Sequence, residues 1–146
     1  MPQRGFGTLS RQDILLPAGT QNSGATALFI YSGQVADFSP GFNSDSGQDF
    51  RDQLQILIET GLTNASQIVD WSANPPIPIV VPASWNANGS SGFPVIAVEN
   101  ATLNFSGGSD HNPPSGGPGL YIFADVTVQH GQLISVQYQV SVRVKL

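Results

Sequence analysis

Residues 134–146 read ISVQYQVSVRVKL, and apolar and polar side chains alternate along the whole stretch. The apolar positions are Ile134, Val136, Tyr138, Val140, Val142, Val144 and Leu146. Alternation with a period of two indicates a β-strand with one buried and one solvated face. At about 3.3 Å per residue the strand spans roughly 43 Å, which is long for a small sandwich. Its far end, VRVKL, is therefore expected to extend beyond the domain and to pair with another chain.

The segment before this strand, Leu120–Gln129, alternates in a similar way, and His130-Gly131 separates the two segments. Glycine at the second position of a tight turn supplies the positive φ that such turns need. The sequence therefore predicts a long C-terminal β-hairpin over residues 120–146.

Other stretches also have strand character. Ala25–Tyr31 is an apolar run, Val95–Phe105 carries apolar residues at alternate positions, and Gln67–Trp71 is expected to form a short strand. Ile77–Val81 is bracketed by prolines, which are confined to the edges and starts of strands, so an edge strand or an extended connection is expected there. Residues 106–119, SGGSDHNPPSGGPG, form a low-complexity loop that cannot contribute to a core.

Regular turn clusters between these strands predict a mainly β fold, an antiparallel β-sandwich or jelly roll in a single domain. The domain is expected to cover residues 13–146. Residues 1–12, MPQRGFGTLSRQ, are polar, basic and glycine-containing, so an extended N-terminal arm is expected there. They lack the apolar run of a signal peptide.

One stretch, about residues 47–60, fits two structures. Phe50, Leu54, Leu57 and Ile58 have helical spacing, and Gly61 stands where a helix would end. Leu54, Ile56 and Ile58 also alternate with less apolar neighbours, as in a strand. We favour one helix at this position, with the strand as the alternative.

The charge distribution excludes several partners. No Lys or Arg occurs from Asp52 to Val142, the formal net charge is -5, and only 10% of residues are charged. A cation-free body cannot follow a phosphate backbone, so neither nucleic acid nor an anionic membrane is expected as a partner. The chain has no cysteine, which excludes disulfides, thiolate metal sites and thiol nucleophiles.

Candidate catalytic and metal-ligating residues are few. His111 adjoins Asp110 in the low-complexity loop, and His130 stands at the turn with Asp125 nearby in sequence. A solvated loop and a plain turn residue are the simpler interpretations. Three acids, Asp45, Asp49 and Asp52, lack the spacing of an EF-hand. No nucleophile motif is present, so we expect no enzyme, cofactor or metal.

The aromatic residues admit one binding hypothesis. Trp71, Trp85, Tyr31 and Tyr121 could stack on sugars if they lay on one face of a sandwich. The simpler interpretation places them in the core and in interfaces. A carbohydrate-binding or fibre-type β-sandwich module is therefore kept as an alternative function.

In size, β content, turn-rich loops and absence of cysteine, the chain resembles accessory virion proteins of tailed phages, in particular capsid decoration or cement proteins. The segments that carry the resemblance are MPQRGFGTLSRQDILLPAGT at the start and LYIFADVTVQHGQLISVQYQVSVRVKL at the end. It implies a homo-oligomer, dimer or trimer, on the capsid exterior, assembled in the host cytoplasm. Its partner would be the major capsid protein or another virion protein. A tail or head-completion protein is a second alternative.

Under this hypothesis the two ends of the chain contact the partner. The expected contact residues are Arg4, Phe6, Arg11, Arg143 and Lys145. Cations at both ends would dock on acidic partner surfaces, while the arms add strands or clamps to neighbouring subunits.

Overall fold

The computed structural model describes residues 3–7, 10–16, 26–39, 41–58, 60, 62, 65–71, 75–87, 92–106 and 119–145. The strands are β1 (Gln3–Gly7), β2 (Ser10–Leu16), β3 (Thr26–Ser39), β4 (Phe42–Ser44), β5 (Phe50–Ile58), β6 (Ile79–Ala87), β7 (Val95–Ser106), β8 (Gly119–Gln129) and β9 (Gly131–Lys145). A short 3-10 turn, η1 (Ala65–Gln67), follows β5. The described residues contain no α-helix, and the predicted mainly β class is confirmed.

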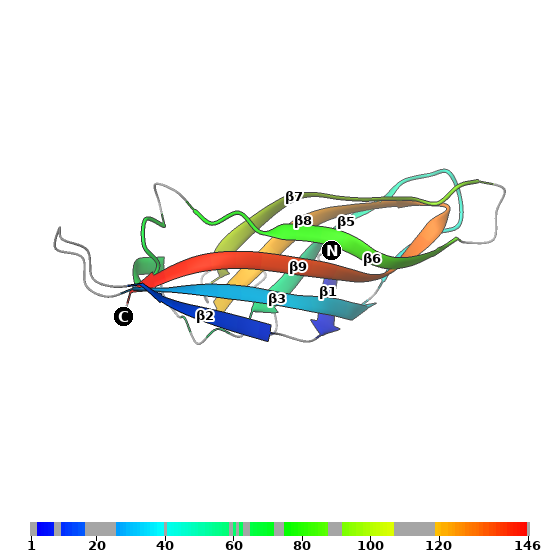
Figure 1. Cartoon of the computed structure of the whole chain (residues 1–146). Coiled ribbons are helices and arrows are strands. Elements are labelled where there is room, and N and C mark those ends of the chain that lie inside the picture. The colour runs from blue at the N-terminus through cyan, green and yellow to red at the C-terminus, as the bar shows by residue number, and fades with distance from the viewer. Residues whose placement is uncertain are drawn as a thin grey trace.

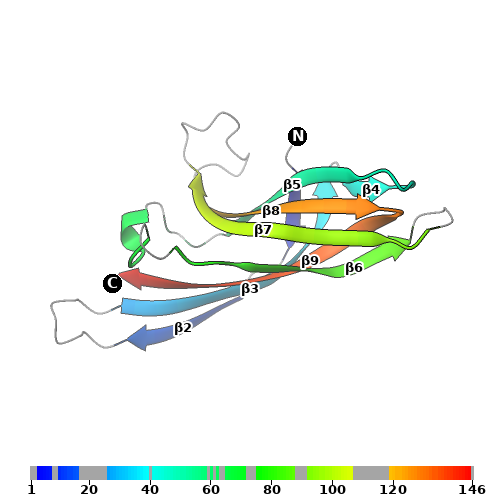
Figure 2. The ribbon, with the colours of Figure 1, turned by 90° about the horizontal axis from the view of Figure 1, so that it is seen from above.

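The strands belong to one hydrogen-bonded sheet that folds over into two layers (Figures 1 and 2). Layer I consists of β6, β9, β3 and β2 in that order, all antiparallel. Layer II consists of β1, β5, β8 and β7. Strand β1 joins the layers, because it pairs antiparallel with the end of β3 and parallel with β5. Strand β4 pairs with the first residues of β9. The predicted sandwich-like single domain is confirmed.

Strand β9 supplies one wall of the core. From Val136 to Val144 every second side chain is buried, which confirms the period-two pattern there. Nearer the start of the strand the pattern shifts by one residue: Leu133 and Ser135 are buried, and Ile134 is half-buried. The ladder between β9 and β6 changes register at the same place. A register irregularity thus lets one long strand keep its apolar side chains in the core.

The predicted hairpin at 120–146 is wrong, although both of its strands are present. Strand β8 pairs with β5 and β7 in layer II, whereas β9 pairs with β3, β4 and β6. The turn between them therefore connects the two layers. Alternation cannot tell these cases apart, because strands that face each other across a core have the same pattern as neighbours in one sheet. The positive φ of the turn, 51°, belongs to His130 and not to Gly131.

The far end of β9 lies inside the fold, so the expectation that VRVKL extends beyond the domain is wrong for the described residues. Arg143 pairs with Leu28 of β3, and Val144 is buried. On the opposite edge Ile68 forms a bridge with Val144. This bridge is all that is seen of the short strand expected at 67–71, whose first residue belongs to η1.

The helix favoured at 47–60 is also wrong, because Phe50–Ile58 is strand β5. Leu54, Ile56 and Ile58 face the core, whereas Leu57 is only half-buried. Strand β5 pairs with β8 along the whole length of β5, and β1 pairs with the middle of β5. Pairing with strands distant in sequence decides between the two periodicities that the segment carries.

The N-terminal segment expected as an arm is extended and paired. Residues 3–7 form β1, and residues 10–12 begin β2, which pairs with β3 as far as Leu16. Of the edge strand or extended connection expected at 77–81, residues 79–81 begin the edge strand β6, which pairs with β9 alone, and residues 77–78 precede it. The peripheral long strands among the described residues are thus β2, β6 and β7 (Figure 2).

Candidate interaction surfaces

An apolar row on the outer face of layer I begins just before strand β6 and continues into its first residues. Because side chains alternate along a strand, Val80 points into the core, while Ile77, Ile79 and Val81 point outward. The outward side chains are 81%, 62% and 45% exposed, respectively. We call these three residues the β6 strip. Apolar side chains exposed side by side typically mark a contact surface.

A column of amide side chains lies beside the strip on β9. Gln139 stands opposite Ile79, and Gln137 stands opposite Val81. On the other side of β9, Ser32 and Gln34 of β3 continue the same rows. A shallow hollow of about 450 Å³ lies over this area. Its described lining is uncharged: Ser10, Ser32, Gly33, Gln34, Ile79, Val81, Gln137, Tyr138 and Gln139.

A buried hydroxyl fixes the strip to the sheet where β6 and β9 change register. Ser135 is almost fully buried, and its Oγ lies 2.5 Å from the Ser84 Oγ. The Gln34 amide also donates to the Ser135 Oγ, at 3.1 Å. These bonds link β6, β9 and β3 through side chains, next to the strip on β6.

A second hollow, of about 360 Å³, begins at the N-terminal end of the strip. It is lined by Trp71, Pro75, Pro76, Ile77, Ala101, Thr102, Leu103 and Asn104. Trp71 is half-buried, and its ring packs against Phe105 with centroids 5.2 Å apart. Ile77 borders this hollow, whereas Ile79 and Val81 border the first one.

The aromatic platform considered for sugar binding is not assembled. Tyr31 and Tyr121 are buried, and Trp71 packs against the core, as the simpler interpretation predicted. Trp85 alone of the four residues is more than half exposed, at 51%.

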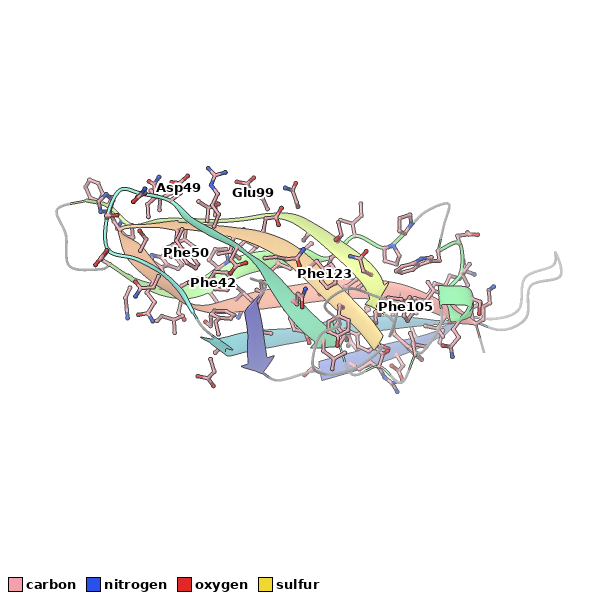
Figure 3. The ribbon with its side chains drawn as sticks, turned by 180° about the vertical axis from the view of Figure 1, so that it is seen from behind. Phe42, Asp49, Phe50, Glu99, Phe105 and Phe123 are labelled. Atoms are coloured by element: carbon pink, nitrogen blue, oxygen red, sulfur yellow. The ribbon has the colours of Figure 1, made fainter. Side chains whose placement is uncertain are left out.

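Layer II has an acidic outer face. Gln53, Asp125 and Glu99 form one row across β5, β8 and β7, so two carboxylates stand directly opposite each other. The Asn100 amide donates to the Asp125 Oδ2 at 3.1 Å. This row lies in a hollow of about 580 Å³. In Figure 3, Asp49 and Glu99 lie on this outer side.

Asp49 is held at one end of that hollow. The Gln129 amide and the Arg51 guanidinium both donate to its carboxylate, and these bonds hold the pKa of Asp49 below its usual range. The Arg51 Nη2 lies 2.7 Å from the Asp49 Oδ2. Among the described residues, no group of three His, Asp or Glu side chains is placed to hold a metal ion.

His130 occupies the turn between the layers, and its backbone N–H donates to the Ser46 carbonyl at 3.0 Å. His111 lies outside the described residues. No helix within the described ranges is long and apolar enough to cross a membrane.

The cationic contact residues predicted from the sequence are not brought together. Arg143 and Lys145 lie at one end of layer I, opposite Leu28 and Thr26 of β3. Arg4 pairs with Ser39 at the other end of the same strand. Ser39 is 11 residue steps from Leu28 (39 minus 28), which corresponds to about 36 Å along an extended strand.

The other two predicted contact residues lie on separate strands. Arg11 is on β2, where its guanidinium bonds to Asp13 and lies 4.5 Å from the centre of the Phe29 ring. Phe6 is on β1, opposite Ala36 of β3.

Sequence reasoning missed the β6 strip, although a signal was present. Pro78 is buried just before β6, and Pro82 within β6 stands opposite the buried Val136, while Ile77, Ile79 and Val81 point outward. The prolines predict an edge strand or an extended connection at 77–81 but do not by themselves assign its faces.

None of the known protein families, curated proteins or solved structures compared with the chain matches it.

Proposed function

We propose that the protein is a structural subunit that binds and stabilises a larger protein shell, of the capsid decoration type. The observation that carries the proposal is the β6 strip, three exposed aliphatic side chains at alternate positions, two at the start of the edge strand β6 and one just before it. The resemblance of the whole chain to decoration proteins supports the same function. The contact face would comprise the strip and the amide column beside it.

The chemistry of this face suits contact with protein. Burying aliphatic side chains contributes about 25 cal/mol per Å² of apolar area. Neutral amides give up water at lower cost than charged groups and can hydrogen bond to a partner backbone. The described lining of the hollow carries no charge, so the matching part of the partner surface would be apolar or neutral.

Many copies of a weak contact would together be sufficient for stable binding to a shell. Each copy offers a small, shallow face, so a single contact is expected to be weak. If subunits associate with one another and sit on a shell with many equivalent sites, the effective concentration raises overall binding without any new contact.

Co-sedimentation tests the proposal, with the purified chain and capsid shells of the virus that encodes it. The wild-type chain should sediment with the shells. The double variant Ile79→Lys and Val81→Lys should stay in the supernatant, because two ammonium groups would be forced into an apolar contact. Phe93→Ser is the matched control, since Phe93 is 90% exposed and lies outside the strip.

Two results would count against the proposal. Shells that leave the wild-type chain in solution contradict the decoration function. Sedimentation that survives the double variant contradicts the β6 strip as the contact face, while leaving the function standing. Circular dichroism of the double variant serves as the check that its fold is intact.

The exposed ring of Trp85 favours a carbohydrate-binding module as the second candidate. This function predicts that the isolated chain binds polysaccharide and that Trp85→Ala abolishes the binding. Calorimetric titration with saccharides distinguishes the two functions. A tail or head-completion protein would use the same face, and the symmetry of the particle separates it from a decoration protein.

A further inference from the structure

The free edge of β2 differs from the other two long peripheral edges. Exposed edges attract other strands, and proteins protect them with proline, charge and bulges. Strand β6 follows Pro78 and contains Pro82, while β7 carries Glu99 and a register shift between Glu99 and Thr102. Strands β6 and β7 also approach each other across the open side of the sandwich.

Strand β2 has no proline and no bulge, and its two charged residues, Arg11 and Asp13, have opposite signs. Its pairing with β3 runs without a register shift from Ser10 to Leu16, and it contains no proline. Its other edge has no partner strand among the described residues, and it forms the outer border of layer I (Figures 1 and 2). Side chains from Ser10 to Ile14 are all exposed.

The charges on β2 are fixed in place. Arg11 and Asp13 lie on the same face of the strand, with the Arg11 Nε 2.8 Å from the Asp13 Oδ1. The Phe29 ring, 4.5 Å from the guanidinium, holds the Arg11 side chain against the sheet. The edge therefore presents one cation and one anion in a defined order.

We propose that β2 pairs with β2 of a second copy of this chain, antiparallel about a two-fold axis, with Gln12 opposite Gln12 of that copy. In this register Arg11 faces the second copy's Asp13, and Asp13 faces the second copy's Arg11. The interface is isologous and closes as a dimer.

Charge selects this register. Residues opposite each other in an antiparallel pair share a face, and like charges there are destabilising. Sliding the second copy's β2 by two residues in one direction would place Arg11 opposite Arg11. Sliding it by two residues in the other direction would place Asp13 opposite Asp13. Pairing centred on Gln12 alternates the charges and places Ser10 opposite Ile14, so the half-exposed Ile14 gains cover.

The dimer would join two copies of layer I into one sheet. Its strand order would be β6-β9-β3-β2 followed by β2-β3-β9-β6 of the second copy. The β6 strips would then lie at the two outer margins of the joined sheet, free to contact another surface. This inference goes beyond the proposed function and does not depend on it, because the dimer forms without a shell.

Mass measurement of the purified full chain by sedimentation equilibrium tests the inference. The wild type should be a dimer. Arg11→Asp and Asp13→Arg should each place like charges opposite each other twice, and each should raise the dimer dissociation constant by about tenfold or more. Arg51→Asp is the matched control, because it removes a similar intrastrand pair on layer II and should leave the dimer unchanged.

Mixing the two variants gives the decisive result. A chain carrying Arg11→Asp, opposite a chain carrying Asp13→Arg, restores an opposite-charge pair at both positions. The mixture should therefore form heterodimers, although neither variant dimerises well alone. Gln12→Lys places two ammonium groups on the two-fold axis, and it should also weaken the dimer.

Four results would overturn the inference. They are a monomeric or trimeric wild type, a dimer that tolerates both charge variants, a mixture that fails to form heterodimers, and a dimer unaffected by Gln12→Lys. None of these measurements involves a shell, so they are separate from a failure of the proposed function.

Discussion

His130 holds the two layers together at the turn between β8 and β9. Its φ of 51° is unusual for a residue with a side chain, and its N–H bonds to the Ser46 carbonyl. Its ring lies close to Gly47 and Gly92, where an added Cβ would come within 3.2 Å and 2.6 Å of ring atoms. The turn role expected from the sequence is confirmed, but its tight packing depends on contacts that the local sequence does not reveal.

Gly131→Ala should destabilise the protein by about 1–3 kcal/mol. A Cβ at Gly131 would lie 2.9 Å from the Asn86 carbonyl oxygen and 3.0 Å from the Pro94 Cβ, so backbone must move. Gly47→Ala should cost less, because its Cβ would approach only the His130 ring, at 3.2 Å. Urea unfolding measures both variants. Equal losses, or a larger loss for Gly47→Ala, would contradict the packing at this turn.

Burial of Tyr138 makes the free energy of unfolding depend on pH in the alkaline range. Burial raises the pKa of Tyr138 to about 12, above the usual value of about 10. The native state then keeps a proton that the unfolded chain releases, so the free energy of unfolding falls as pH rises from about 10 to 12. Tyr138→Phe should lessen this fall, as measured by urea unfolding at successive pH values. A wild type and a variant with the same pH dependence would argue against the raised pKa.

At the scale of elements, the alternation of apolar and polar residues predicted where strands occur but not which strands pair. The β9 pattern was confirmed from Val136 to Val144, because side-chain direction is a local property of a strand. Partner choice is not local: β8 and β9 follow one another but lie in different layers. Likewise, the segment from Phe50 to Ile58 carried helical and strand spacing together, and only pairing with β1 and β8 decided between them.

Two leucines in β5 test the strand assignment. Leu54 is fully buried, so Leu54→Ala should cost about 2–5 kcal/mol. Leu57 points away from the core and is half-buried, so Leu57→Ala should cost clearly less. A helix would place both residues on one face and give similar losses. Thermal unfolding of the two variants distinguishes these cases.

At the scale of the whole molecule, the sandwich has two chemically different outer faces. Layer I offers aliphatic and amide groups, and layer II offers carboxylates with Arg51 held by Asp49. The scarcity of cations predicted a largely neutral, acidic-leaning body, but could not assign these groups to faces. The predicted cationic contacts are spread over separate strands because sequence ends need not meet in space.

Relieving the acidic face should stabilise the protein. Glu99 and Asp125 are directly opposite on β7 and β8, so Glu99→Gln should add about 0.2–1 kcal/mol of stability. Salt screens such pairs, so the gain should shrink at high ionic strength. Melting temperatures at low and high salt provide the measurement. A gain that does not respond to salt would show that charge repulsion is not its cause.

Because the chain has no cysteine, one introduced thiol can report directly on the proposed contact face. The measurement is the rate of maleimide labelling of Ile79→Cys, free in solution and bound to capsid shells, with Phe93→Cys as the reference. We predict fast labelling of both free variants and strong protection of Ile79→Cys alone on shells. Equal labelling of bound and free Ile79→Cys, on shells that retain the protein, would contradict assembly through the β6 strip.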